Sequence, residues 1–202
     1  SRIKFQNFGN SNYRSREVGE GFRNLDNARI IRIIYPTTET KFPLKRDFKK
    51  SPRIQLLDTG LVNYSLGLFP ELLKLEDLSE AYRGAIIPHI IFQELISLGQ
   101  IKDELPYFWV REKTQSSAEV DLVMTFNGEI IPIEIKSGAT GSLKSLHQFI
   151  NTTHCKIAFR IYGGEFKIED TLTPAGNKYT LYNIPYYLGT KLYDYIEYAL
   201  NA

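Results

Sequence analysis

The sequence predicts an α/β fold in which a mixed β-sheet is flanked by helices. Apolar residues recur at helical spacing within residues 79–98, whereas apolar and polar residues alternate between residues 107 and 136. Strand-rich sequence between helical segments favours a sandwich of helices and sheet. The 202 residues are 43% hydrophobic and 24% charged, which is enough apolar material for a packed core.

Residues 1–55 are expected to form the last part of a winged-helix unit. Residues 12–26 have a short helical pattern, residues 30–35 are β-branched and strand-like, and residues 54–58 form the next strand after a polar and basic loop. Helix, strand, basic loop and strand in this order suit the end of a winged helix. We therefore place a domain boundary after residue 55, and residues 56–202 form the second domain.

Positive charge is concentrated in this N-terminal segment. Residues 1–55 contain 13 lysines and arginines against 5 acidic residues, whereas the rest of the chain contains 12 against 18. Such a separation indicates a surface that faces an anion such as the DNA backbone. The densest basic stretch comprises Lys45, Arg46, Lys49, Lys50 and Arg53. Alternatively, these side chains only keep a loop hydrated, because backbone binding needs several phosphate contacts together.

The middle of the chain is expected to be helical. After a break at Gly60, residues 61–68 and 71–78 have the pattern of two short helices. A longer apolar pattern covers residues 79–98 and contains Pro88. Proline has no N–H to donate and its ring crowds the preceding turn, so Pro88 either kinks the long helix or begins it. We favour a helix that begins near Pro88.

The second half of the chain combines strands with two helices. The expected strands are residues 107–111, 119–126, 129–136, 156–162 and 165–169. A short helix is expected at residues 142–150 and a C-terminal helix at residues 186–200, which holds many of the tyrosines. Tyrosine-rich amphipathic helices usually pack their rings, so we expect these tyrosines to pack against the sheet.

A hairpin turn at Asn127-Gly128 is the strongest local signal in the chain. A two-residue type I′ turn needs positive φ at both positions, and this pair of residues adopts it readily. If these two residues form the loop, Phe126 faces Glu129 and every pair of facing residues has numbers that sum to 255. The turn therefore predicts the register of the whole hairpin.

That register places four charged side chains together. Asp121 faces Glu134, Glu119 faces Lys136, and alternation puts all four on one side of the sheet, with apolar core residues from Val120 onward on the other. Two facing carboxylates repel, and a divalent cation between them would turn repulsion into coordination. Lys136 would then lie near a scissile phosphate. Alternatively, the four side chains form an exposed charge ladder in which Glu119 pairs with Lys136 and Asp121 finds its partner on a neighbouring strand.

Asp121 followed by Glu134-Ile135-Lys136 resembles the metal site of the PD-(D/E)XK nuclease superfamily, whose fold is restriction-endonuclease-like. The longer context is more specific. It comprises Leu57-Asp58-Thr59-Gly60-Leu61, Arg83-Gly84-Ala85, Gln93-Glu94-Leu95, Tyr107-Phe108-Trp109, Ala118-Glu119-Val120-Asp121 and Ile131-Pro132-Ile133-Glu134-Ile135-Lys136-Ser137-Gly138. Taken in order, these segments resemble the uncharacterised C-terminal domain that follows the AAA-type P-loop ATPase module in many bacterial and archaeal proteins. The resemblance covers residues 26–202.

This resemblance implies that Asp121 and Glu134 bind Mg²⁺ or Mn²⁺ and that Lys136 assists phosphodiester hydrolysis. Nuclease-like folds commonly add a helix glutamate to the metal ligands. Members of the family often carry Glu-Asn at the positions occupied here by Pro88-His89, which leaves Glu94 as the helix carboxylate. Glu94 could equally form a salt bridge on the helix surface.

Several classes of function are not expected on this chain. The phosphate-binding pattern G-x-x-x-x-G-K-[ST] is absent, so no nucleotide site is expected here and ATP hydrolysis would belong to a missing N-terminal AAA module. Because the sequence starts at Ser1 without a methionine, we expect it to be part of a longer protein. Its apolar runs are too short for a membrane span, and one cysteine, Cys155, fits a reducing compartment, which together predict a cytoplasmic protein.

Three functions remain open from the sequence. The first is a metal-dependent deoxyribonuclease, and the second is a nuclease-like fold that binds DNA or its own ATPase module without cutting. The third is a protein-interaction module that regulates the ATPase. The retained Asp121, Glu134 and Lys136 favour the first function, whereas Pro88 favours the others.

Overall fold

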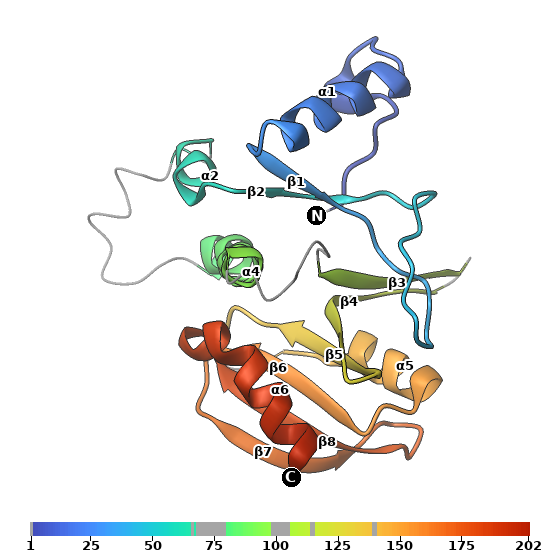
Figure 1. Cartoon of the computed structure of the whole chain (residues 1–202), viewed down its shortest axis with the longest axis vertical. Helices are drawn as coiled ribbons and strands as arrows, with labels where there is room; N and C mark the ends of the chain where they lie inside the picture. The colour runs from blue at the N-terminus through green and yellow to red at the C-terminus, as the bar shows by residue number, and fades with distance from the viewer. Residues whose placement is uncertain (1, 66, 68–79, 98–105, 114–115, 139–140) are drawn as a thin grey trace.

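The computed structural model describes residues 2–65, 67, 80–97, 106–113, 116–138 and 141–202. A two-stranded sheet and a six-stranded sheet organise this part of the chain (Figure 1). The elements are η1 (Phe8–Asn10), α1 (Ser15–Asn27), β1 (Ile31–Ile34), β2 (Arg53–Leu56), α2 (Thr59–Ser65), α4 (Glu80–Ser97), β3 (Tyr107–Lys113), β4 (Ser116–Phe126), β5 (Glu129–Ile135), α5 (Lys144–Thr153), β6 (Ile157–Tyr162), β7 (Lys167–Leu172), β8 (Lys178–Pro185), η2 (Tyr186–Lys191) and α6 (Leu192–Asn201).

The N-terminal segment has the element order expected from the sequence. Helix α1 is followed by β1 and β2, which pair antiparallel from Ile31–Leu56 to Ile34–Arg53 and are joined by the loop of residues 35–52. The β-branched run of β1 explains its strand conformation. Its assignment to a winged-helix unit, and the domain boundary after residue 55, stay predictions.

The six-stranded sheet is mixed, which confirms the predicted α/β class. Its strand order is β3-β4-β5-β6-β8-β7. Strand β6 runs parallel to both β5 and β8, while the remaining neighbours are antiparallel. Helix α5 makes the crossover that the parallel β5–β6 pair requires. Strand β8 was not expected from the sequence, and it lies inside the sheet between β6 and β7.

Helices cover both faces of this sheet (Figure 1). One face packs against α4 and α6 through a core that includes Ile91, Leu122, Ile133 and Ile196. The opposite face packs against α5 through a second core that includes Trp109, Val120, Leu146 and Phe149. The two cores decide which side of the sheet each strand residue faces.

Helix α4 starts at Glu80, so the expectation that it begins near Pro88 is wrong. Pro88 lies inside the helix. Ile86 and Ile87 before the proline are buried in the same core as Ile91 and Leu95 after it. Burial on both sides of Pro88 therefore offsets the lost helical hydrogen bond. The short helix expected at residues 71–78 lies outside the described residues.

The C-terminal segment packs against the sheet mainly through aliphatic residues, and not mainly through its tyrosines as expected. It consists of η2 followed by α6, and the residues of α6 that are buried are Leu192, Ile196 and Ala199. Tyr187 and Tyr198 are 75% and 57% exposed, so tyrosine packing explains only part of this contact. No helix in the described part of the chain has the length and apolar character needed to cross a bilayer.

Candidate active site between strands β4 and β5

The β4–β5 hairpin has the predicted turn and register. Asn127 and Gly128 have φ values of 51° and 83°. Facing pairs run from Phe126–Glu129 to Leu122–Ile133, and every pair obeys the predicted sum. The local preference of Asn-Gly for positive φ is therefore sufficient to set this register.

A β-bulge interrupts β4 at Asp121. Tyr107 of β3 faces Val123 while Trp109 faces Val120, so two residues of β4 lie opposite one residue of β3. Val120 consequently packs on the α5 side of the sheet, whereas Leu122 packs on the α4 side. The expectation that the apolar residues from Val120 onward share one face is wrong for Val120, because the bulge adds a residue to β4.

The same bulge separates Glu119 from Glu134 and Lys136. Glu134 faces the α5 side, because Ile133 and Ile135 on either side of it pack in the α4 core. Glu119 faces the α4 side, because Val120 beside it packs against α5. Lys136 pairs with Glu134 and not with Glu119. The expectation of four charges on one face, and the alternative of a Glu119–Lys136 ladder, are both wrong.

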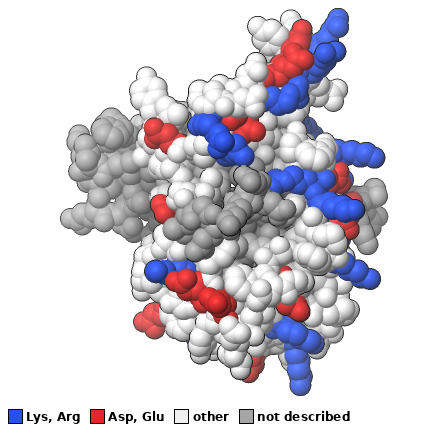
Figure 2. Space-filling view, in the orientation of Figure 1, with Lys and Arg blue, Asp and Glu red and all other residues white. Residues whose placement is uncertain are grey.

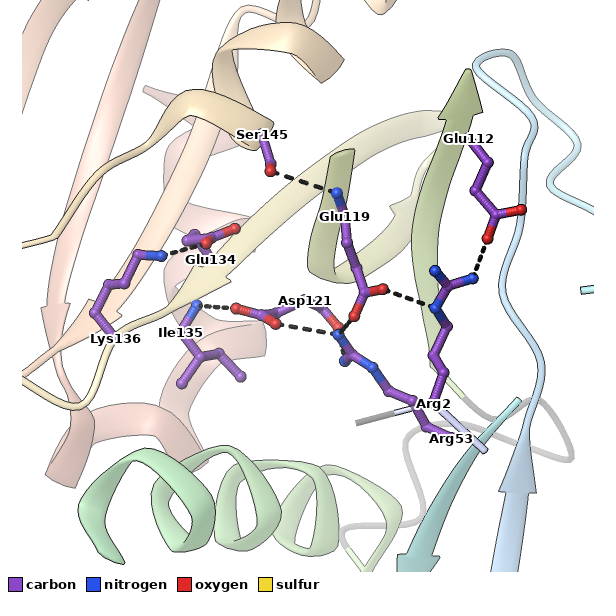
Figure 3. Close-up of polar contacts among 9 residues, drawn as sticks. All are labelled: Arg2, Arg53, Glu112, Glu119, Asp121, Glu134, Ile135, Lys136 and Ser145. Carbon is purple, nitrogen blue, oxygen red and sulfur yellow. Dashed lines mark hydrogen bonds and ion pairs between the residues drawn. The ribbon is translucent and has the colours of Figure 1, made fainter. Parts of the chain in front are cut away.

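Asp121 lies between the two strands at the end of their regular pairing. Its Oδ2 accepts the backbone N–H of Ile135 at 3.1 Å (Figure 3). Its Oδ1 accepts from Nη2 of Arg53 at 3.2 Å, and its backbone carbonyl accepts from Nη1 at 3.1 Å. The bulge thus directs the carboxylate into the junction of β4, β5 and β2.

Glu134 is a buried carboxylate whose hydrogen bonding is incomplete. It is 6% exposed, its Oε1 accepts from Lys136 Nζ at 2.5 Å, and its Oε2 has no hydrogen-bond partner. Burial, followed by the negative charge of Asp121, raises the pKa of Glu134 to about 7, against the opposing effect of Lys136. The two carboxylates are therefore close enough to disfavour a second negative charge.

Lys136 is held beside Glu134 by a close backbone approach. A Cβ added to Gly141 would lie 2.9 Å from Lys136 Cδ, nearer than real Cβ atoms approach. Glycine at this position therefore allows the loop before α5 to pack on the lysine side chain. The ammonium of Lys136 is consequently directed to the carboxylate of Glu134.

A polar cleft of about 320 Å³ opens beside Asp121. Arg53 and Gln55 of β2 line one wall, and Gly84, Pro88 and His89 of α4 line the other. The residues by which α4 lines this cleft therefore include Pro88 and supply no carboxylate. This cleft lies between the N-terminal sheet and the helix.

The structure brings Asp121, Glu134 and Lys136 together but does not add Glu94. Glu94 does not line the cleft beside Asp121. In the described part of the chain, no three or more His, Cys, Asp or Glu side chains gather in a way that could hold a metal ion. The protein thus presents two carboxylates as candidate ligands.

The predicted DNA-contacting residues have different surroundings. Lys45 and Lys49 are exposed, whereas Lys50 pairs with Glu112 at 2.6 Å. The Arg46 guanidinium lies 4.9 Å from the centre of the Tyr107 ring. Basic side chains are prominent on the side of the molecule where the loop of residues 35–52 runs (Figures 1 and 2). Among the predicted DNA-contacting residues, Lys45 and Lys49 therefore offer exposed positive charge.

Arg53 belongs to the candidate site and not to the exposed basic surface. Its side chain is 17% exposed and pairs with both Glu119 and Asp121. It is the last cation in a chain of ion pairs that joins the N-terminal segment to the six-stranded sheet (Figure 3). In order, this ion-pair chain contains Lys50, Glu112, Arg2, Glu119, Arg53 and Asp121.

Sequence reasoning missed two polar residues beside Glu134. Arg160 faces Glu134 in the β5–β6 pairing, and Asn183 faces Arg160 in the β6–β8 pairing. The Arg160 guanidinium lies 4.3 Å from the centre of the Tyr162 ring. Alternation within β6 could have indicated Arg160, whereas Asn183 required the unexpected β8.

Comparison with known families assigns the chain. Residues 83–186 match the model of a family described as a domain of unknown function, DUF4143. The chain belongs to this family. The matched residues include Asp121, Glu134 and Lys136 but not the basic loop. No curated protein and no solved structure matches the chain.

Proposed function

We propose that this DUF4143 chain is the nuclease-like C-terminal module of a prokaryotic AAA-type ATPase. In this proposal it binds DNA and hydrolyses phosphodiester bonds with Mg²⁺ or Mn²⁺. The observation that carries the proposal is the buried Glu134 carboxylate, which has a free Oε2 and lies beside both Asp121 and Lys136. An unpartnered buried carboxylate oxygen is costly, and a cation would offset that cost.

The residues fit a divalent cation in part. Asp121 and Glu134 supply the hard oxygen ligands that Mg²⁺ and Mn²⁺ prefer, and Mg²⁺ commonly takes only one or two protein carboxylates. The cation would supply positive charge for a phosphodiester oxygen. Lys136 would stabilise negative charge that develops on the phosphate, because its ammonium is already held at Glu134.

Titration calorimetry with Mn²⁺ tests the metal site. We expect the wild-type chain to bind about one ion, and the double variant Asp121→Asn, Glu134→Gln to lose at least about tenfold in affinity, because both ligand charges are removed. A matched control is Asp194→Asn, Glu197→Gln, which removes two exposed carboxylates of α6. Equal Mn²⁺ affinity in the two double variants would overturn the metal site.

DNA binding is expected to depend on the exposed lysines of the 35–52 loop. The variant Lys45→Ala, Lys49→Ala should bind duplex DNA about tenfold more weakly, with a salt slope reduced by about 2, because each lysine releases counterions. Lys50→Ala should have a smaller effect, since Glu112 already holds that ammonium. Lys191→Ala, on η2, is the control. Fluorescence anisotropy across salt concentrations measures both quantities, and an unchanged slope would exclude these lysines.

A second candidate function is a regulatory module that does not cut DNA. It is favoured by the Arg53–Asp121 ion pair, which neutralises a candidate ligand, and by Pro88 in place of a helix carboxylate. A cleavage assay with Mn²⁺ separates the two functions. Nicking that is lost in Lys136→Met supports the nuclease, whereas Mn²⁺ binding without any nicking supports the regulatory module.

A further inference from the structure

In the structure, the guanidinium of Arg53 already neutralises the carboxylate of Asp121. Arg53 Nη2 lies 3.2 Å from Asp121 Oδ1 and also pairs with Glu119. Its guanidinium carbon lies 4.3 Å from the centre of the Phe108 ring, which is a cation–π contact. A cation that coordinates Oδ1 and a guanidinium bound to the same oxygen would repel each other. A cation that coordinates Oδ1 of Asp121 therefore requires Arg53 to move.

The Arg53 side chain also borders a cleft in which it could bind a second partner. Together with Asp121 it lines the polar cleft between β2 and α4, whose volume is about 320 Å³. A guanidinium presents a planar set of donors that matches phosphate oxygens, and it binds them by charge-assisted hydrogen bonds. The cleft thus lets the same side chain meet a phosphate close to Asp121.

We propose that Arg53 is an exchangeable partner of Asp121. It neutralises the carboxylate before a divalent cation binds, and it turns to a phosphate of the nucleic-acid substrate once the cation has taken Asp121. This inference rests on the proposed function, because it concerns the same site. Each negative group keeps a positive partner throughout the exchange, so neither state leaves an unpaired charge in the cleft.

The exchange has two measurable consequences. Removal of the Arg53 charge abolishes the competition, so Mn²⁺ binds more tightly in the absence of DNA. Binding of a phosphate by Arg53 frees Asp121, so DNA strengthens Mn²⁺ binding, and by linkage Mn²⁺ strengthens DNA binding equally. The part of the second effect that comes from freeing Asp121 needs Arg53 and is lost without it, whereas direct attraction between the cation and a phosphodiester oxygen remains.

Mn²⁺ titrations of wild type, Arg53→Met and Arg2→Met test the exchange. Methionine keeps an unbranched apolar side chain, and Arg2→Met removes a charge from the same ion-pair chain without touching Asp121. We expect Arg53→Met to bind Mn²⁺ on the order of tenfold more tightly than wild type, and Arg2→Met to change little. A short duplex with phosphorothioate linkages, which keep the charge and resist hydrolysis, should tighten Mn²⁺ binding to wild type at least about fivefold more than it tightens Mn²⁺ binding to Arg53→Met.

The outcomes separate this inference from the proposed function. Equal Mn²⁺ affinity of Arg53→Met and Arg2→Met, or an unchanged effect of DNA in Arg53→Met, would overturn the exchange while the metal site stands. Mn²⁺ binding to no variant would overturn the metal site and the exchange together. If circular dichroism shows that Arg53→Met is unfolded, Arg53→Lys replaces it, because lysine keeps the charge but cannot span both carboxylates. We then expect Arg53→Lys to bind Mn²⁺ more tightly than wild type but less tightly than expected for Arg53→Met. An affinity equal to that of wild type would reject the exchange.

Discussion

The wild-type protein is expected to lose stability as pH rises from about 4.5 to about 7, whereas the variant Glu134→Gln should not show this loss. The pKa of Glu134 is raised to about 7 by burial and by the charge of Asp121. A carboxyl group whose folded pKa is raised contributes stability below its unfolded pKa and loses it as pH approaches the folded pKa. Above pH 7 the variant should exceed the wild type by up to about 3 kcal/mol in free energy of unfolding.

Urea denaturation at pH 4.5 and pH 8 measures this difference. Glu129→Gln is the matched control, because Glu129 lies in the same strand but is exposed. We expect the stability of the control to follow the wild type across this range. Parallel pH profiles for Glu134→Gln and wild type would contradict the account of Glu134 as a buried carboxylate under the influence of Asp121.

Addition of Mn²⁺ should reduce the difference in free energy of unfolding between the wild type and Glu134→Gln at pH 8. A cation that binds only the folded protein stabilises it by mass action, and it prefers the ionised carboxylate. At pH 8 the wild type should therefore gain stability with Mn²⁺, whereas Glu134→Gln should gain little. The pH experiment and the metal experiment thus examine the same carboxylate by independent means.

Trp109→Ala is expected to cost about 3–5 kcal/mol in free energy of unfolding. Trp109 is 1% exposed, and its ring centre lies 5.0 Å from that of Phe149 in an edge-on arrangement. It faces Val120, the last residue of β4 before the bulge at Asp121. The variant therefore removes a large packed side chain at the contact between α5, β3 and the candidate site.

Trp109→Phe separates ring packing from hydrogen bonding. The indole Nε1 has no hydrogen-bond partner, so phenylalanine loses volume but no hydrogen bond, and a cost of about 1–2 kcal/mol is expected. Tyr64→Ala is the control, because Tyr64 is 84% exposed and a change there should stay within about 0.5 kcal/mol. Equal losses for Trp109→Ala and Tyr64→Ala in urea denaturation would show that Trp109 does not hold α5 on the sheet.

Local sequence preferences account for the elements that the sequence predicted well. Asn127-Gly128 alone sets the turn of the β4–β5 hairpin, and alternating apolar residues define β4 to β6. The strand that was missed, β8, has the same character as these strands. Its position beside β6 is a pairing of distant segments, which no local pattern encodes.

The same distinction between local and long-range features applies to the candidate site. Spacing within one hairpin is enough to place Glu134 and Lys136 two residues apart on one side of β5, and to place Asp121 on the neighbouring strand. The spacing could not show that Lys136 would pair with Glu134, nor that Glu94 would remain apart from both carboxylates. These outcomes depend on where β4 bends and on how α4 packs.

The sequence by itself determined the hairpin, its register and the mixed α/β class, because these follow from backbone preferences and side-chain alternation over a few neighbouring residues. Only the tertiary structure decided the bulge at Asp121, the course of α4 through Pro88 and the role of Arg53. Arg53 is separated from Asp121 by 68 positions in the chain, so their ion pair exists only after β2 has docked beside β4. Burial and charge pairing between segments that are far apart in the sequence decide such features. Local residue preferences therefore do not predict them.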